Sequence, residues 1–121
     1  MKKSAIYSHY NRDCLSVAEL RRAVRDGRKR TVCGKRIYSF KFSGNKKEAH
    51  ELLKGLSPIE EKFRFNLKVL DGYRKRGAYC EEELYRRYLS HRLEYCVFMN
   101  NFLKENQKKY NYCFSAERVY A

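Results

Sequence analysis

The sequence predicts an α+β fold, in which a small antiparallel sheet, made of a basic β-hairpin and a C-terminal strand, packs against three to four helices. Three observations predict it. Capping residues precede apolar positions at helical spacing, hydrophobic and polar residues alternate at period two in two separate segments, and no Gly or Pro follows Ala78. A length of 121 residues favours one basic globular domain over residues 1–121.

The first predicted helix begins at Val17 and ends before Gly27. Ser16 and Glu19 have the spacing of a capping box, in which each side chain accepts a hydrogen bond from the backbone of the other residue. Gly27 is expected to end the helix because it adopts the left-handed C-terminal cap without strain. Apolar side chains share one face of this helix, and they are Val17, Leu20 and Val24.

A basic β-hairpin is predicted over Arg28–Phe42, with Gly34 in its turn. Its second arm alternates aromatic and polar residues, which is typical of a strand with one buried face. The aromatic positions are Tyr38, Phe40 and Phe42. The same alternation returns near the C-terminus and predicts a strand over Tyr110–Tyr120. We expect this strand to pair with the hairpin and to protect one of its edges.

A second helix is predicted over residues 46–54. Asn45 and Glu48 repeat the spacing of a capping box, and Gly55 stands where the helix is expected to end.

A third helix is predicted to start directly afterwards. Ser57 and Pro58 are residues favoured at the N-cap and at the first helical position, respectively. Apolar residues then keep helical spacing until Gly77, which is the expected stop. Gly72 is a weak point, so the stretch is compatible with one helix or with two shorter ones.

The widest apolar pattern follows Ala78, where Glu81, Glu82 and Glu83 place negative charge at the favourable end of a helix. Two neighbouring stripes follow, namely Leu84, Tyr88, His91, Tyr95, Phe98 and Phe102, beside Tyr85, Leu89, Cys96, Met99 and Leu103. A helix with so wide an apolar arc is expected to be long, central and covered on two sides.

The positive charge is concentrated in one segment. The chain has 28 Lys and Arg against 14 Asp and Glu, a formal net charge of +14. Residues 21–47 hold eleven basic residues and one acid, Asp26, and so carry +10 of that charge. The eleven are Arg21, Arg22, Arg25, Arg28, Lys29, Arg30, Lys35, Arg36, Lys41, Lys46 and Lys47. We therefore predict that these residues form the binding surface.

The expected partner of this surface is nucleic acid, either RNA or DNA. Dense like charge destabilises the folded protein by self-repulsion, and exposed ion pairs contribute only ~0 to 1 kcal/mol. A polyanion relieves the repulsion, and engaging about 5 to 8 of the side chains gives a logarithmic salt slope of roughly −4 to −7 on duplex DNA. The sequence thus predicts a non-catalytic nucleic-acid-binding protein.

Two geometries are compatible with that function. The helix over Val17–Asp26, followed by a basic hairpin, resembles a winged helix, which implies that the helix enters the groove and that Arg30–Arg36 forms the wing. The alternative is an arginine-rich RNA-binding surface on which tyrosines stack unpaired bases. The stacking candidates are Tyr7, Tyr10, Tyr73, Tyr79 and Tyr120.

Other functions remain open. A basic face also suits an acidic protein or an anionic lipid, and the size fits a small accessory or inhibitor protein, of the kind viruses and mobile elements encode, that docks on a nucleic-acid-processing enzyme. A metal-free ribonuclease would use His9 or His50 as general base, with arginines holding the scissile phosphate. No phosphate loop or hydrolase motif accompanies these histidines.

The composition argues against several classes. The longest apolar run, Tyr95–Met99, has five residues and is too short to span a membrane, and the N-terminus lacks the apolar region of a signal peptide. The five cysteines are widely spaced and form no CxxC pair. We therefore expect free, mostly buried thiols in a reducing, cytoplasmic compartment, with no metal site and no small-molecule cofactor.

Overall fold

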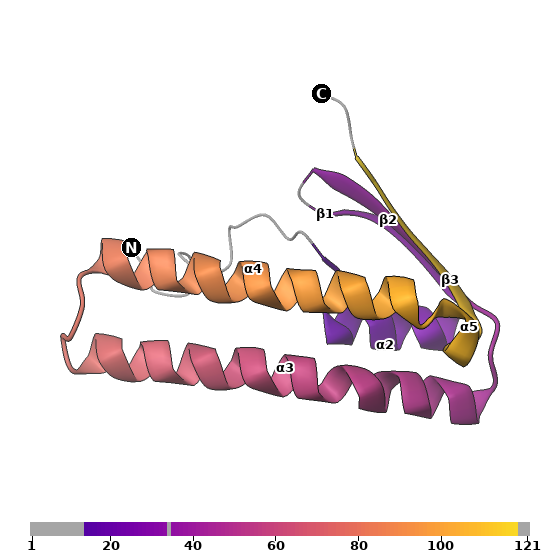
Figure 1. Ribbon diagram of the computed structural model, residues 1–121, viewed down its shortest axis with the longest axis horizontal. Coiled ribbons are helices and arrows are strands. Elements are labelled where there is room, and N and C mark those ends of the chain that lie inside the picture. Colours follow the sequence, from indigo (N-terminus) through magenta and orange to yellow (C-terminus); the bar gives the residue numbers. More distant parts are fainter. Residues whose placement is uncertain (1–13, 34, 119–121) are drawn as a thin grey trace.

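The computed structural model describes residues 14–33 and 35–118, and Figure 1 shows their arrangement. Helices and strands pack together as the predicted α+β fold. In chain order the elements are α2 (Val17–Asp26), β1 (Arg28–Cys33), β2 (Arg36–Phe42), α3 (Lys46–Lys75), α4 (Glu81–Glu105), α5 (Gln107–Tyr110) and β3 (Tyr112–Arg118). The two long helices α3 and α4 lie side by side, and the sheet stands at one end of this helical pair (Figure 1).

Helix α2 forms as its sequence predicts. The Ser16 hydroxyl accepts a hydrogen bond from the Glu19 amide at 3.1 Å, and the Glu19 carboxylate accepts one from the Ser16 amide at 3.2 Å. Gly27 adopts a φ of +87°, which only glycine reaches without strain. The buried face consists of Val17, Leu20 and Ala23, whereas Val24 is half-buried. Burial of this face holds α2 against β1, β2 and α3.

The sheet is antiparallel, with the order β1-β2-β3, so β2 is the central strand. The C-terminal strand pairs with the hairpin, as predicted. Aromatic side chains from β2 and β3 cover one face and belong to the core, and they are Tyr38, Phe40, Tyr112 and Phe114. The Phe40 and Tyr112 rings lie 5.1 Å apart. The predicted turn residue Gly34 lies outside the described residues.

The prediction of two helices between residues 46 and 76 is wrong, because α3 is continuous from Lys46 to Lys75. The Asn45 capping box is present, but Gly55 and Pro58 lie inside the helix. A Cβ atom on Gly55 would come within 2.7 Å of the Phe102 ring, so this glycine permits close approach of α4. Pro58 is exposed, and water can solvate the carbonyl that has lost its amide donor.

Packing along a single face explains the continuity of α3. Leu52 and Leu56 before the proline are fully buried, and Ile59 and Phe63 after it pack against the same core at helical spacing. Breaking the helix at Pro58 would separate these contacts from one another. Burial of these side chains, at roughly 1.5 to 3 kcal/mol each, offsets a proline cost of about 3 kcal/mol. Gly72 likewise lies within the helix, which ends near Gly77 as predicted.

Helix α4 packs antiparallel to α3 through aromatic contacts. The Phe63 and Tyr95 rings stack at 4.5 Å, and the Tyr95 hydroxyl donates a hydrogen bond to Glu60 at 2.6 Å. Burial, together with the hydrogen bond and the charge of Glu60, raises the pKa of Tyr95 well above its ordinary value.

None of the helices in residues 14–33 and 35–118 has both the length and the apolar character needed to cross a membrane.

The expectation that α4 is covered on two sides along its length is only partly met. Three apolar residues at intervals of four remain exposed, namely Leu89 (38%), Leu93 (62%) and Val97 (45%). Their exposure means that α3 and the sheet leave part of this side of α4 uncovered. We call these three residues the apolar stripe.

The C-terminal strand is shorter than the predicted range Tyr110–Tyr120. Tyr110 belongs to the short helix α5, where its ring stacks on Phe102 at 6.1 Å. Asn111 follows with a left-handed φ of 56°, so the chain turns before the strand begins at Tyr112. Tyr120 lies outside the described residues.

Candidate nucleic-acid interface

The face of the sheet that the helices leave uncovered carries polar and cationic side chains. Directly opposed residues of antiparallel strands project from the same face. Arg28 pairs with Lys41, which pairs with Cys113, and Arg30 pairs with Ser39, which pairs with Ser115. All six lie out of phase with the buried aromatics. We call them the outer-sheet surface, namely Arg28, Arg30, Ser39, Lys41, Cys113 and Ser115.

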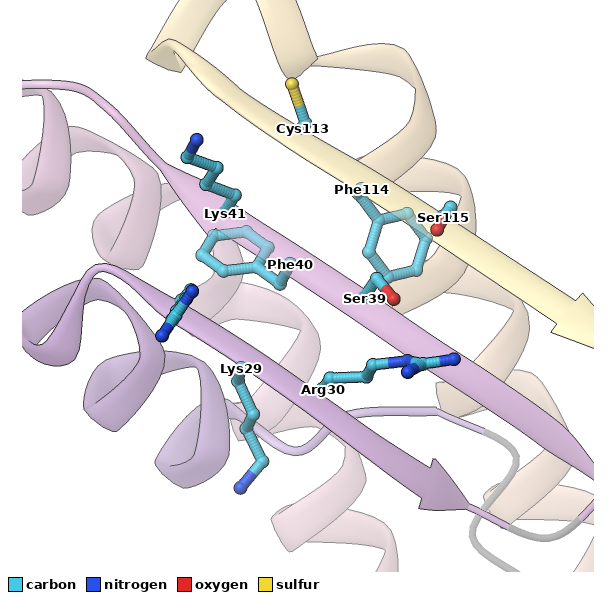
Figure 2. A pocket seen from close by; sticks show the side chains of 9 residues that line it. Lys29, Arg30, Ser39, Phe40, Lys41, Cys113, Phe114 and Ser115 are labelled. Atoms are coloured by element: carbon cyan, nitrogen blue, oxygen red, sulfur yellow. The ribbon is translucent and has the colours of Figure 1, made fainter.

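A shallow hollow of about 610 Å³ lies over this surface. Figure 2 shows residues of all three strands around it, with Arg30 from β1 directed toward Ser39 on β2 and Lys41 extending from the same strand. The hollow therefore combines cationic groups with two hydroxyls. Such groups suit a phosphate or sulfate oxygen, because each donates a hydrogen bond to an anion.

Arg28 and Lys41 form a like-charge pair across β1 and β2. Like charges directly opposite in a sheet are destabilising, by an amount comparable to the ~0.2–1 kcal/mol that a favourable pair contributes. Both side chains are exposed, and within the described ranges neither has an ion-pair partner. The pair lowers the stability of the free protein, and a bound anion would remove that penalty.

Cations elsewhere in the described chain behave differently. Along α3 and α4 many are neutralised by acids, at distances from 2.9 to 3.3 Å, and these pairs are Lys62–Glu94, Arg64–Glu60, Arg74–Glu81, Lys75–Asp71, Arg86–Glu83 and Arg87–Glu83. Of the eleven predicted cations, Arg25 is the one with an ion pair in the described residues, at 3.3 Å to Asp26. Unpaired positive charge is thus concentrated near the sheet and α2.

The structure does not bring the eleven cations onto one face. Three of them, Arg28, Arg30 and Lys41, belong to the outer-sheet surface. Arg21, Arg22 and Arg25 are exposed on α2, which packs against the opposite, covered face. Lys29 pairs with Phe40 and therefore points to the covered side, in a different direction from Arg30 in Figure 2. The sheet separates the two groups of cations.

Lys35 and Arg36 occupy a second location, at the end of the hairpin. They line a cleft of about 290 Å³ between the hairpin and α4, together with Arg118 of β3. Arg118 pairs with Arg36 across the strands and was not among the sequence-based candidates. Lys46 and Lys47 are exposed in the first turn of α3, where the helix dipole disfavours positive charge.

The outer-sheet surface also contains residues that the sequence-based prediction omitted, namely Ser39, Cys113 and Ser115. A signal for them exists, because they alternate with the aromatic residues of β2 and β3. Extending the period-two pattern from Phe40 and Phe114 to the intervening positions would have placed them beside Lys41.

Of the tyrosines predicted to stack on bases, the structure describes Tyr73 and Tyr79, and these two lie away from this surface. Tyr73 and Tyr79 pack edge to face on each other at 5.1 Å, at the connection between α3 and α4. That connection is at the end of the helical pair opposite the sheet (Figure 1). Arg76 lies over the Tyr73 ring and Arg87 over the Tyr79 ring. Tyr7 and Tyr10 lie outside the described residues.

Of the two histidines considered for catalysis, the structure describes His50. His50 is exposed on α3, His91 is half-buried on α4, and His9 lies outside the described residues. In the part of the chain that the structure describes, no group of three or more His, Cys, Asp or Glu side chains is placed to hold a metal ion.

Searches of protein-family models, of curated proteins and of solved structures found no significant match to this chain. A functional assignment therefore depends on the geometry and charge of the surfaces described above.

Proposed function

We propose that this protein binds nucleic acid without catalysing a reaction, and that the outer-sheet surface contacts the phosphate backbone. The observation that carries the proposal is the opposed pair of Arg28 and Lys41. The pair destabilises the sheet, has no acidic partner among the described residues, and lies beside a hollow that offers hydroxyl donors. A phosphate group placed between the two cations turns an unfavourable contact into two favourable ones.

The outer-sheet surface favours contact with phosphate and sugar over stacking on bases. Its cross-strand rows contain Arg, Lys, Ser and Cys, and the next row adds Val32, Ile37 and Glu117, none of which is aromatic. Base stacking needs an exposed aromatic ring, whereas phosphate contacts need cations and hydroxyls. We therefore expect binding with little sequence preference and with a steep dependence on salt. RNA and DNA are separate arms of the experiments that follow.

We place this activity in the cytoplasm. Most thiols were predicted to be buried, but of the four cysteines whose side chains the structure describes, Cys80 and Cys113 are exposed. Exposed thiols persist in a reducing compartment. The same two residues supply an experiment that needs no substitution. Cys113 lies on the outer-sheet surface beside Lys41, whereas Cys80 is the N-cap of α4 at the far end of the helical pair.

Bound nucleic acid is expected to protect Cys113 from alkylation by N-ethylmaleimide and to leave Cys80 reactive, because only Cys113 adjoins the proposed contacts. Alkylation rates at each cysteine are measured by peptide mass spectrometry, with single-stranded DNA, duplex DNA or structured RNA present in separate reactions. High salt should remove the protection. Equal alkylation of Cys113 with and without a nucleic acid that the protein binds would contradict the proposed surface.

A second candidate function is docking on an acidic protein, as an accessory or inhibitor protein would. The apolar stripe favours it, because Leu93 and Val97 also line the cleft that holds Lys35, Arg36 and Arg118. A row of apolar residues at helical spacing beside three cations complements an amphipathic helix whose polar face is acidic.

This second function is tested with a fluorescent synthetic peptide that has leucine on one helical face and glutamate on the other. Leu93→Glu is expected to weaken peptide binding by tenfold or more, because the new negative charge repels the glutamates of the peptide and the substitution removes an apolar contact. A tenfold loss corresponds to about 1.4 kcal/mol. Phe65→Glu is the matched control, because Phe65 is equally exposed at 64% but lies on α3 outside the cleft. Equal losses of anisotropy signal in both variants would exclude a specific site.

A further inference from the structure

Two cysteines that are distant in the sequence meet in the core. The Cys14 thiol donates to the Cys96 sulfur at an Sγ–Sγ distance of 2.8 Å, and the residues are 82 positions apart. Both are buried, with exposed fractions of 0% and 3%. A disulfide has an S–S distance of about 2.05 Å, so the two sulfurs need to approach by less than about 1 Å to form one.

A positive charge lies close to these buried thiols. Burial by itself lowers the pKa of Arg92, but that pKa is raised overall because Cys14 and Cys96, followed by two tyrosines, lie close to the guanidinium. The interaction is reciprocal, so the positive charge of Arg92 offsets part of the desolvation cost that either buried cysteine meets when it loses its proton during reaction. Tyr38 does not compete as an acid, since burial raises its pKa to about 12.

One of the two cysteines borders a cleft. Cys96 lines the cleft of about 290 Å³ between the hairpin and α4, and Lys35, Arg36 and Arg118 line the same cleft. The cations attract small anionic molecules, and oxidised glutathione is an anionic disulfide of this kind. Cys14 lies behind Cys96, where it is placed to attack the Cys96 sulfur in a second step.

We propose that Cys14 and Cys96 are a redox-active pair, which a small anionic disulfide such as oxidised glutathione converts to an intramolecular disulfide. The Cys96 thiolate attacks one sulfur of oxidised glutathione, breaks its S–S bond and releases one glutathione thiolate. The Cys14 thiolate then attacks Cys96 Sγ, breaks the mixed disulfide and releases the second glutathione. The protein loses two electrons, and its two thiol protons pass to the two glutathione thiolates.

The disulfide would tie Cys14, two residues before the N-cap of α2, to Cys96 in α4. Cross-linking residues so far apart in the chain restricts the unfolded state strongly, so the oxidised protein is expected to be more heat-stable. The increase in Tm should be roughly 10 °C or more for a domain of this size.

The experiment uses the full chain, incubated with oxidised glutathione, alkylated with N-ethylmaleimide and digested with trypsin. Mass spectrometry is expected to find the peptides that contain Cys14 and Cys96 joined, two hydrogen masses below their sum, and reduced glutathione should reverse the link. Cys96→Ser should abolish the link and the increase in Tm, while Cys80→Ser and Cys113→Ser preserve both. These two control positions are exposed.

The result in the wild-type protein decides the matter even if a core variant fails to fold. Finding Cys96 stably joined to glutathione with no link to Cys14, or finding Cys14 or Cys96 linked to Cys33, Cys80 or Cys113 instead, would overturn the proposal. Full alkylation of both buried cysteines after oxidation would overturn it as well.

Discussion

Replacing both Arg28 and Lys41 with glutamate is expected to weaken nucleic-acid binding by roughly 100-fold or more at physiological ionic strength. Each hydrogen bond to a charged phosphate contributes about 1.5–3 kcal/mol, and two are lost. Loss of two phosphate contacts should also flatten the logarithmic salt slope by about 2. The measurement is fluorescence anisotropy of labelled single-stranded DNA, duplex DNA and structured RNA at several salt concentrations.

The matched control for that variant is Lys54→Glu combined with Lys68→Glu, which changes the net charge by the same amount. Both lysines are exposed on α3, away from the sheet. The outer-sheet hypothesis requires the control to retain most of its affinity. Equal losses in the two double variants would mean that net charge alone attracts the nucleic acid. Because the glutamates at 28 and 41 again oppose like charges, the two strands keep a comparable electrostatic penalty.

Substituting Phe40 by alanine is expected to lower the free energy of unfolding by about 3–5 kcal/mol. Phe40 is 1% exposed, lies on the central strand and packs against the Tyr112 ring. Removing the ring leaves a cavity between the sheet and the helices, which the rigid central strand cannot close. Urea denaturation followed by circular dichroism measures the change.

Val32→Ala is the comparison for this loss, because Val32 belongs to the same hairpin but is 63% exposed on the uncovered face. Its free energy of unfolding should change by no more than about 0.5 kcal/mol. A small effect of Phe40→Ala, similar to that of Val32→Ala, would contradict the assignment of the two faces of the sheet. The same result would remove the basis for placing Arg28, Arg30 and Lys41 together.

The assignment of faces connects the two predictions. The strand register places Phe40 on the covered face of the sheet and Lys41 on the uncovered face. The aromatic layer that stabilises the fold therefore also orients the cations. Aromatic burial supplies the free energy that the opposed cations reduce. An acid opposite Arg28 would have stabilised the sheet, so the lysine at that position is the observation on which the proposed contact with an anion rests.

Local features were predictable because neighbouring residues determine them. The Ser16 and Asn45 capping boxes formed as expected, since each depends on two residues three positions apart. The alternation around Tyr38 and Phe114 correctly located two strands. In contrast, Pro58 and Gly55 carry the local signals of helix boundaries and lie inside α3, because packing against α4 outweighs those preferences.

The candidate site was predictable only as a set of cations in one segment. Charge counting located residues 21–47. Consecutive residues of a strand project to opposite faces, so Lys29 and Arg30 lie on different faces of the sheet. Counting charge within this segment also could not include Ser115 or Arg118, because both belong to the C-terminal strand β3.

By itself, the sequence determined where α2, α3 and α4 begin, which strand positions are apolar and where positive charge is concentrated, because those properties depend on residues close together in the chain. Only the tertiary structure decided that α3 continues through Pro58, that the sheet divides the cations into separate groups, and that Cys14 meets Cys96. These outcomes depend on which distant surfaces pack together, and the free energy of burying those surfaces exceeds the local preferences that oppose it.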